Sequence, residues 1–332
     1  MHMTNALISP AVGTVMMAVS TAAAVRSVKK VSEEGLGENK IPLMGVAGAM
    51  VFAAQMVNYP IPVAGSSGHF VGGLFLSILL GPHAAFLTIL SILSVQAMFF
   101  ADGGLLALGC NIFNMGFLAC FVAYPLIYKP VEKRFCKSGK FLGALLASVA
   151  ALELGAFAVA TQTLLSGRVE LPFGAFLSAM MPVYLPIGIG EGIITAAVVA
   201  LLSKVSNKAE GAQTGSGSRR ILAYLGTLAA ITGIFFSWFA SSSPDGLEWS
   251  VFQIVGNTEI SQTSTLGEAL SDLQSRISFL PYYGFKFTEN TTSILSYVGT
   301  SLSIAAGEIL TIALTYAFGF MAKRSGGRQS IR

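Results

Sequence analysis

The sequence predicts an all-α, multi-pass membrane protein, and three observations support this prediction. Apolar residues of the AVILMFWYC set make up 53% of the 332 residues, whereas charged residues make up 11%, against roughly 25% in soluble domains. The mean hydropathy is +0.70. The apolar residues also form runs of the length that a helix needs to cross a bilayer, about 20 residues. This composition excludes a soluble enzyme and a disordered protein, and the small net charge of +4 excludes a nucleic-acid binder.

Nine apolar segments, bounded by charges, prolines and glycine clusters, are candidate membrane-spanning helices. They are Leu7–Val25, Ile41–Val57, Phe70–Leu80, Ala84–Phe100, Asn111–Tyr128, Phe141–Leu165, Phe176–Leu202, Ile221–Ala240 and Ile294–Met321. The third and fourth segments are the ambiguous pair. They form either two short spans with a turn at Gly81-Pro82 or one kinked helix.

The positions of the basic residues favour nine spans, because Lys and Arg gather on the cytoplasmic side of membrane proteins. With nine spans and the N-terminus outside, all but three of the 20 basic residues lie on the inner side, and the three are Arg168, Arg276 and Lys286. One kinked helix would instead place most basic residues outside. We therefore expect an outer N-terminus and a cytoplasmic C-terminus. No basic residue precedes the first apolar run, so we expect no signal peptide and a retained Met1.

The segment Lys204–Arg220 divides the chain into two parts. It reads KVSNKAEGAQTGSGSRR, a composition typical of a flexible linker, and we place it in the cytoplasm. Residues 1–203 then contain seven spans, and residues 221–332 contain two. Between these last two helices lies an outer segment, residues 241–293. A structureless loop of this length is uncommon, so we expect a small outer domain or a long, partly ordered loop.

The second span carries small residues at four-residue intervals, Gly45, Ala49 and Ala53. A stripe of this kind permits close approach between two helices. We therefore expect it to face another helix, either within this chain or on another subunit.

Two histidines on the outer side, His2 and His69, indicate a metal site. A histidine at position 2 behind a free amino group is a natural chelator. The terminal amine, the deprotonated amide nitrogen of residue 2 and the imidazole close five- and six-membered rings around one metal ion. With His69 as the fourth nitrogen, a square-planar site favours Ni(II) or Cu(II) over Zn(II). In the alternative interpretation, His2 is a solvated terminal residue and His69 a loop residue in the sequence GSSGH. The third histidine, His83, lies at an inner turn.

Three carboxylates, Glu153, Glu191 and Glu308, fall within predicted spans, where an ionisable group is costly and by default functional. The alternative for each is a buried hydrogen bond between helices. Other polar side chains gather at the outer ends of the spans, where we expect them to line a cavity and orient the histidines. These are Gln55, Asn58, Ser67, Gln96, Asp102, Asn111 and Asn114. The chain has no GxxxxGK[ST] loop, so active transport would need a partner ATPase or an ion gradient.

Several segments share a recognisable pattern. They are MHMTNALISPAV (Met1–Val12), FAAQMVNYPIPVAGSSGHFVGG (Phe52–Gly73), LLGPHAAFLTI (Leu79–Ile89), FADGGLLALGCNIFNMG (Phe100–Gly116), IGIGEGIITAAVV (Ile187–Val199) and FASSSPDGLEW (Phe239–Trp249). The first five resemble the substrate-binding membrane subunit of nickel/cobalt energy-coupling-factor (ECF) transporters, the CbiM/NikM family. The last, with its two flanking helices, is similar to the small CbiN/NikN subunit. The resemblance covers nearly the whole chain and matches a fused NikMN arrangement.

The resemblance implies a seven-helix ECF S-component bundle, followed by two helices and an outer loop that helps metal reach or leave it. It implies a metal bound to the Met1 amine, the amide and imidazole of His2, and His69. It also implies a transmembrane scaffold (T/Q) subunit, cytoplasmic ATPase (A/O) subunits and a place in a prokaryotic cell membrane. Two positions depart from the family pattern: Thr4-Asn5, where an acidic residue is frequent, and Tyr184, where a histidine is common.

The function expected from these features is that of a metal-binding component of an ATP-driven Ni(II) importer. We expect no enzymatic activity and no cofactor, with the metal as cargo. A Co(II) importer is the alternative within this class. Nickel is favoured because it suits four planar nitrogens and stands above cobalt in the affinity order. Two other classes are a gradient-driven carrier that uses Glu153 or Glu191 as a proton relay, and an intramembrane metalloenzyme that uses His69 and a glutamate.

Overall fold

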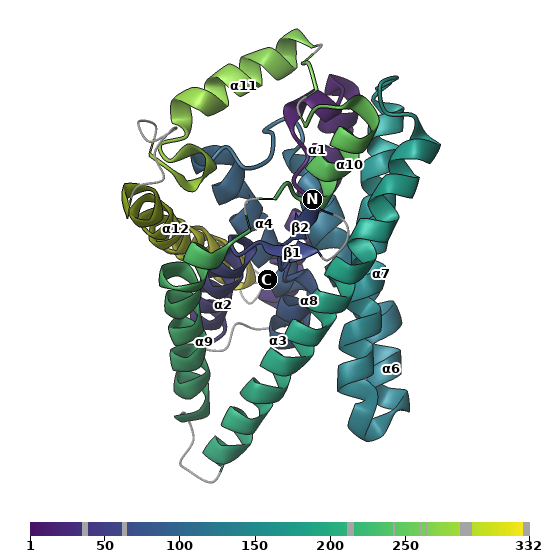
Figure 1. The fold of residues 1–332 in the computed structure, drawn as a ribbon. Coiled ribbons are helices and arrows are strands. Elements are labelled where there is room, and N and C mark those ends of the chain that lie inside the picture. Colours follow the sequence, from purple (N-terminus) through teal and green to yellow (C-terminus); the bar gives the residue numbers. More distant parts are fainter. Residues whose placement is uncertain are drawn as a thin grey trace.

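The computed structural model describes residues 1–34, 39–61, 65–210, 216–241, 243–258, 260–262, 264–285 and 294–327. Within these ranges the chain is almost entirely helical, with one two-stranded sheet (Figure 1). Six described helices are long and apolar enough to cross a membrane. They are α1 (Pro10–Glu33), α4 (Pro82–Phe99), the continuous run of α5 (Leu108–Asn111), η2 (Ile112–Tyr128) and α6 (Lys129–Arg134), α7 (Cys136–Leu165), α8 (Phe173–Glu210) and α12 (Ile294–Gly327). The predicted all-α, multi-pass membrane protein is confirmed.

The two ends of the helix bundle carry different elements. Helices α10 (Gly246–Val255) and α11 (Thr265–Ile277) cover one end, which we call the α11 end (Figure 1). Helix α6 lies at the opposite end, which we call the α6 end. The N-terminal segment, the C-terminal ends of α2 (Lys40–Gln55) and α4, and the start of η2 all meet near the α11 end. This arrangement agrees with the alternating directions predicted for the apolar segments.

The third predicted span, Phe70–Leu80, is shorter in the structure than expected. Helix α3 begins at Gly73 and ends at Leu80, so it measures about 12 Å and crosses less than half of a bilayer. An antiparallel hairpin of β1 (Tyr59–Ile61) and β2 (Ser66–Gly68) precedes it. The expected turn between the third and fourth segments is present, because Gly81 adopts a left-handed φ of 84° between α3 and α4.

The hairpin packs inside the helix bundle. Ser66, Ser67 and His69 are buried, and a Cβ at Gly68 would lie 2.6 Å from the Ile187 side chain of α8. Non-helical backbone is tolerated at membrane depth where protein surrounds it. The apolar run Phe70–Leu80 did not reveal that only a short helix is present, because burial inside a protein and burial in lipid both select apolar residues.

The expected flexible linker, Lys204–Arg220, is largely helical. Helix α8 continues to Glu210, and α9 (Ser216–Ile234) begins at Ser216. Residues 211–215 lie outside the described ranges. The sequence KVSNKAE at the end of α8 contains Lys, Ala and Glu, which have high helix propensity. The polar residues at the end of α8 therefore extend the helix and do not form a flexible linker.

The second part of the chain packs closely on the first. A Cβ at Gly45 of α2 would lie 3.0 Å from Tyr316 of α12, and a Cβ at Gly307 of α12 would overlap the Phe52 ring of α2. Ala49 and Ala53 are buried. The prediction that the small-residue stripe of α2 faces a helix is confirmed, and the helix that Gly45 faces belongs to this chain.

The described residues between α9 and α12 form a cover over the α11 end. Helix α10 starts with a capping box, in which Asp245 Oδ1 accepts a hydrogen bond from Glu248 N and Glu248 Oε2 accepts one from Asp245 N. On α11, Gln274 Nε2 donates to the carbonyl oxygens of Ala97 and Gly103. The cover is thus tied to the end of α4 and to the loop that follows it.

Candidate metal site

The first residues of the chain lie inside the bundle. Met1 and Met3 are 2% and 0% exposed. Asn111 Oδ1 accepts a hydrogen bond from Met3 N at 2.8 Å, and Asn111 Nδ2 donates to Met3 O at 3.1 Å. The Asn111 amide therefore pairs with the Met3 backbone as a neighbouring strand would. This pairing fixes the chain directly after His2.

Two further amides hold the same segment. Asn5 Oδ1 accepts from Leu106 N, and Asn5 Nδ2 donates to Ser271 Oγ of α11, each at 2.8 Å. Asn114 exchanges two hydrogen bonds with Gln162 of α7 and also contacts the Met3 sulfur. Asn111 and Asn114 thus act on the backbone and side chain of Met3, one residue away from His2. Asn5, at one of the positions that depart from the family pattern, links the N-terminal segment to the cover.

The structure brings His2 and His69 together. Their ring centroids are 5.4 Å apart and the ring planes are 21° from parallel. His69 follows strand β2 and is 7% exposed. His83 lies elsewhere, at the start of α4, where its Nδ1 is 3.2 Å from Ser27 Oγ of α1. The two histidines predicted to share a site are therefore neighbours, and the third is not part of it.

Burial keeps both imidazoles neutral. Desolvation, together with the nearby positive charge of the N-terminus, lowers the pKa of His69 to about 3. Desolvation also lowers the pKa of His2, although Asp102 opposes that shift. Neutral imidazole is the form that binds metal ions.

The terminal amine of Met1 forms an ion pair with Asp245, at 2.7 Å from Oδ2. Burial tends to raise the pKa of Asp245, but the amine, through its charge and its hydrogen bond, brings the pKa down to about 2. A cavity of about 10 Å³, enough for roughly one water molecule, is lined by Met1, His69, Asp245 and Tyr184. The Tyr184 hydroxyl is buried without a hydrogen-bond partner among the described groups.

Asp245 was not among the residues predicted for the site. It lies 244 positions from Met1, and no local pattern connects the two. The sequence did contain one usable signal, since Asp245 and Glu248 have the spacing of a capping box. That spacing identifies the start of a helix, but not what the free oxygen of the aspartate contacts.

Three of the other predicted residues lie beside His2 or pair with a residue that does. Gln96 Oε1 lies 3.1 Å from His2 Nε2, and Gln55 pairs with Gln96. Asp102 Oδ1 lies 3.5 Å from His2 Nδ1, and Asp102 Oδ2 accepts a hydrogen bond from Tyr283.

Ser67 and Asn58 contact the second part of the chain instead. Ser67 N donates to Pro244 O, and Ser67 Oγ donates to Ser243 O. The Asn58 carbonyl accepts from Ser241 N at 2.7 Å. These contacts hold the segment before Asp245 against the hairpin that carries His69.

Of the three intramembrane carboxylates, Glu191 is hydrogen-bonded to the backbone just after His69. It is 3% exposed and accepts hydrogen bonds from Val71 N at 3.0 Å and Gly72 N at 3.1 Å. It thereby satisfies the amides at the start of α3, directly after His69. Glu153 lies on α7, and Glu308 lies on α12 near Gly233. In the described part of the chain, neither lines the cavity between Met1 and His69.

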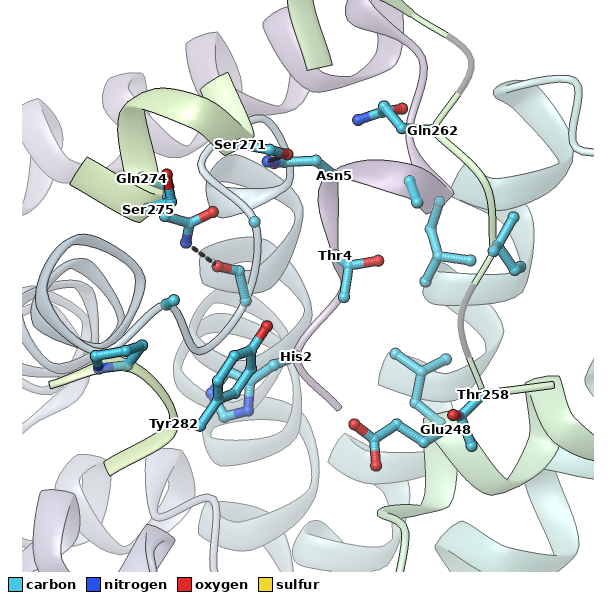
Figure 2. Close-up of a pocket in the computed structure, with 18 of the residues that line it drawn as sticks. His2, Thr4, Asn5, Glu248, Thr258, Gln262, Ser271, Gln274, Ser275 and Tyr282 are labelled. Carbon is cyan, nitrogen blue, oxygen red and sulfur yellow. Dashed lines mark hydrogen bonds between the residues drawn. The ribbon is translucent and has the colours of Figure 1, made fainter. Parts of the chain in front are cut away.

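A larger pocket of about 780 Å³ lies at the α11 end, between the N-terminal segment and the cover. Figure 2 shows His2 and Glu248 in the lower part of the view, apart from each other, and Asn5 and Ser271 at the top. Its described lining is mainly neutral, and Glu248 is the carboxylate among those residues. This pocket gives a ligand from the α11 end access to His2.

The sequence comparisons agree with this architecture. Residues 2–209 match the family CbiM, described as a cobalt uptake substrate-specific transmembrane region. The chain belongs to the CbiM family. Residues 219–324 match the PDGLE domain, a range that runs from within α9 to within α12. The chain is thus a metal-transport membrane component of the CbiM type with a fused PDGLE domain.

Relatives of this CbiM-family chain include fused and single-part proteins. The putative fused nickel transport protein NikMN of Archaeoglobus fulgidus is 30% identical, with 85% of this chain and 86% of the relative covered. The cobalt transport protein CbiM of Sorangium cellulosum is 31% identical over 48% of this chain and 72% of its own. A crystal structure of a transition metal transporter is 33% identical, with a TM-score of 0.55, and covers 62% of this chain and 94% of its own.

The site differs from one built of side chains. Among the described residues, no group of three or more His, Cys, Asp and Glu side chains could hold a metal ion. The terminal amine and the His2 amide are main-chain nitrogens directly beside these two imidazoles.

Proposed function

We propose that this chain is the substrate-specific component of an ATP-driven Ni(II) importer. The observation that carries the proposal is the burial of the free amino terminus beside two neutral imidazoles. The Met1 amine, the His2 amide and imidazole, and the His69 imidazole supply four nitrogens. Membership in the CbiM family supports a role in metal transport.

The chemistry of the four nitrogens favours nickel. Two chelate rings through His2 impose a plane, and a deprotonated amide is a strong-field ligand that suits square-planar Ni(II). Nickel also stands above cobalt in the affinity order for nitrogen ligands. Co(II) remains the alternative cargo, and the family description and several relatives name cobalt.

The energy source in this proposal is a set of partner subunits. The sequence contains no phosphate-binding loop of the GxxxxGK[ST] type. We infer that a transmembrane scaffold (T/Q) subunit and cytoplasmic ATPase (A/O) subunits complete the transporter. In this arrangement the α11 end faces outward, and the α6 end, with its basic residues, faces the cytoplasm.

The decisive experiment changes the position of the amine while it keeps every side chain. One additional methionine before Met1 moves the amine out of chelate reach. Bound nickel per purified chain, measured by elemental analysis with a C-terminal tag throughout, should fall at least about tenfold. His2→Ala and His69→Ala should have the same effect.

The matched control is His83→Ala, which removes an imidazole at the other end of α4 and should leave nickel binding intact. Full nickel binding by the extended chain would contradict the proposed ligand set. Competition between Ni(II) and Co(II) for the wild-type site separates the two cargo candidates.

A further inference from the structure

A continuous chain of hydrogen bonds connects His2 to Glu191. Glu191 Oε2 accepts from Val71 N at 3.0 Å, and Val71 O accepts from Gln55 Nε2 at 2.8 Å. Gln55 Oε1 accepts from Gln96 Nε2 at 2.7 Å. Gln96 Oε1 then lies 3.1 Å from His2 Nε2. This series of hydrogen bonds runs from α8 through the residues before α3, then through α2 and α4, to the N-terminal segment.

The direction of these hydrogen bonds is fixed by the backbone of Val71. A backbone carbonyl oxygen only accepts, so Gln55 must turn its amide nitrogen toward Val71 and its oxygen toward Gln96. Gln96 must then donate to Gln55, which leaves the Gln96 oxygen facing His2. This orientation follows from the carbonyl at one end and needs no independent assignment of either glutamine amide.

The alternative orientation would leave buried groups unpaired. Gln55, Gln96 and Glu191 are 2%, 0% and 3% exposed. If both glutamine amides were reversed, the Gln55 oxygen would face the Val71 carbonyl oxygen. A buried polar group without a partner is destabilising. The described orientation is therefore strongly preferred.

The last link determines which imidazole nitrogen carries the proton. The Gln96 oxygen accepts, so His2 Nε2 must donate. A neutral imidazole with its proton on Nε2 has its lone pair on Nδ1. Nδ1 is also the nitrogen that closes a six-membered ring with the His2 amide nitrogen, whereas Nε2 is one atom farther away. Asp102 Oδ1, 3.5 Å from Nδ1, favours the opposite tautomer, so the Gln96 contact is needed to oppose it.

We propose that Gln55 and Gln96 act as an amide relay, anchored at Val71, which holds His2 in the Nε2–H tautomer and presents Nδ1 to the metal. This inference rests on the proposed function only for its consequence, the binding of metal. The tautomer itself is a property of the metal-free protein. Gln55 and Gln96 are positioning residues, because they act through His2 and do not contact the metal in the proposed ligand set.

The test measures the tautomer directly. The chain has three histidines, so a His83→Ala background with ¹⁵N-labelled histidine leaves two imidazoles, His2 and His69. Their ring-nitrogen chemical shifts distinguish protonated from unprotonated Nε2. Gln96→Met removes the acceptor while it keeps the length of the side chain. We expect metal-free His2 to carry its proton on Nε2 in the parent protein and to shift toward Nδ1–H in Gln96→Met.

Two further variants separate the relay from a general packing defect. Gln55→Met breaks the relay without touching His2, and we expect a shift in the same direction as in Gln96→Met. Gln162→Met removes another buried glutamine, which pairs with Asn114, and should leave the His2 tautomer unchanged. Both relay variants should weaken Ni(II) binding by about 10–100-fold, as loss of an outer partner of a metal ligand typically does.

The outcomes are distinct. Retention of Nε2–H in Gln96→Met would overturn the relay. A full tautomer shift with unchanged nickel affinity would overturn its proposed role in presenting Nδ1 to the metal. The same shift in Gln162→Met would also overturn it. A parent protein that shows Nε2–H on His2 but binds no nickel would contradict the proposed function and leave the tautomer result standing.

Discussion

Asp245 Oδ2 lies 2.7 Å from the Met1 amine, so this carboxylate is sensitive to any change in the charge of the amine when a metal binds. In the metal-free protein the amine contributes one positive charge beside the carboxylate. In the proposed complex, a divalent metal replaces one proton on the amine and one on the His2 amide, so the net charge beside Asp245 is the same. The carboxylate can therefore remain in place in both states. An aspartate from the PDGLE domain thus serves the free and the loaded N-terminus alike.

The pH dependence of binding follows from this exchange. Burial lowers the pKa of both histidines, that of His69 to about 3, so near neutral pH the imidazoles have no protons to release. Binding should release about two protons, one from the amine and one from the amide, and affinity should rise with pH. Calorimetric titration with Ni(II) in buffers of different ionisation enthalpy measures the number released. Release of no protons would contradict the use of the amine and amide as ligands.

At the scale of elements, the sequence predicted the helices better than the segments between them. The long spans were predictable because each buries an apolar run of the required length. The half-length α3 was not, since the apolar residues from Phe70 onward look the same whether they face lipid or protein. The chemistry of the site was partly predictable, because His2 behind a free amine is a local pattern. Asp245 was not, because its contact with Met1 depends on how two distant parts dock.

The contact between α2 and α12 should control that docking. A Cβ at Gly307 would overlap Phe52, whereas a Cβ at Gly226 of α9 would meet only Val46, at 3.9 Å. Replacing a helix-interior glycine with alanine stabilises by about 0.5–1 kcal/mol where space allows. Gly226→Ala should therefore raise the melting temperature of the purified protein, and Gly307→Ala should lower it. Equal effects of the two substitutions would show that the α2–α12 contact is loosely packed.

At the scale of the whole molecule, the second part covers the site that the first part builds. Its segment before α10 pairs with Ser67, its Asp245 holds the Met1 amine, and its α11 holds Asn5. In the proposed function, a metal ion from the α11 end would pass through the pocket between the cover and the N-terminal segment. The fused PDGLE domain is in this way part of the wall of the site.

The proposed orientation in the membrane can be tested by labelling single cysteines. Glu268 on α11 and Lys133 on α6 are both exposed and lie at opposite ends of the bundle (Figure 1). In a background with the native cysteines replaced by alanine, an impermeant thiol reagent added to intact cells should modify Glu268→Cys. It should modify Lys133→Cys only after the membrane is permeabilised. The reverse pattern would place the α11 end in the cytoplasm.

The burial of Met1 also has a consequence for how the protein matures. The proposed first ligand is not encoded as a side chain, because it exists only when the amino group carries no formyl or acetyl substituent. Such a substituent would remove the positive charge that pairs with Asp245. Once the N-terminal segment has docked, Met1 is 2% exposed, and a processing enzyme could no longer reach it. Unblocking of the nascent chain must therefore precede closure of the bundle, so the order of biosynthetic steps determines whether a folded molecule can capture metal.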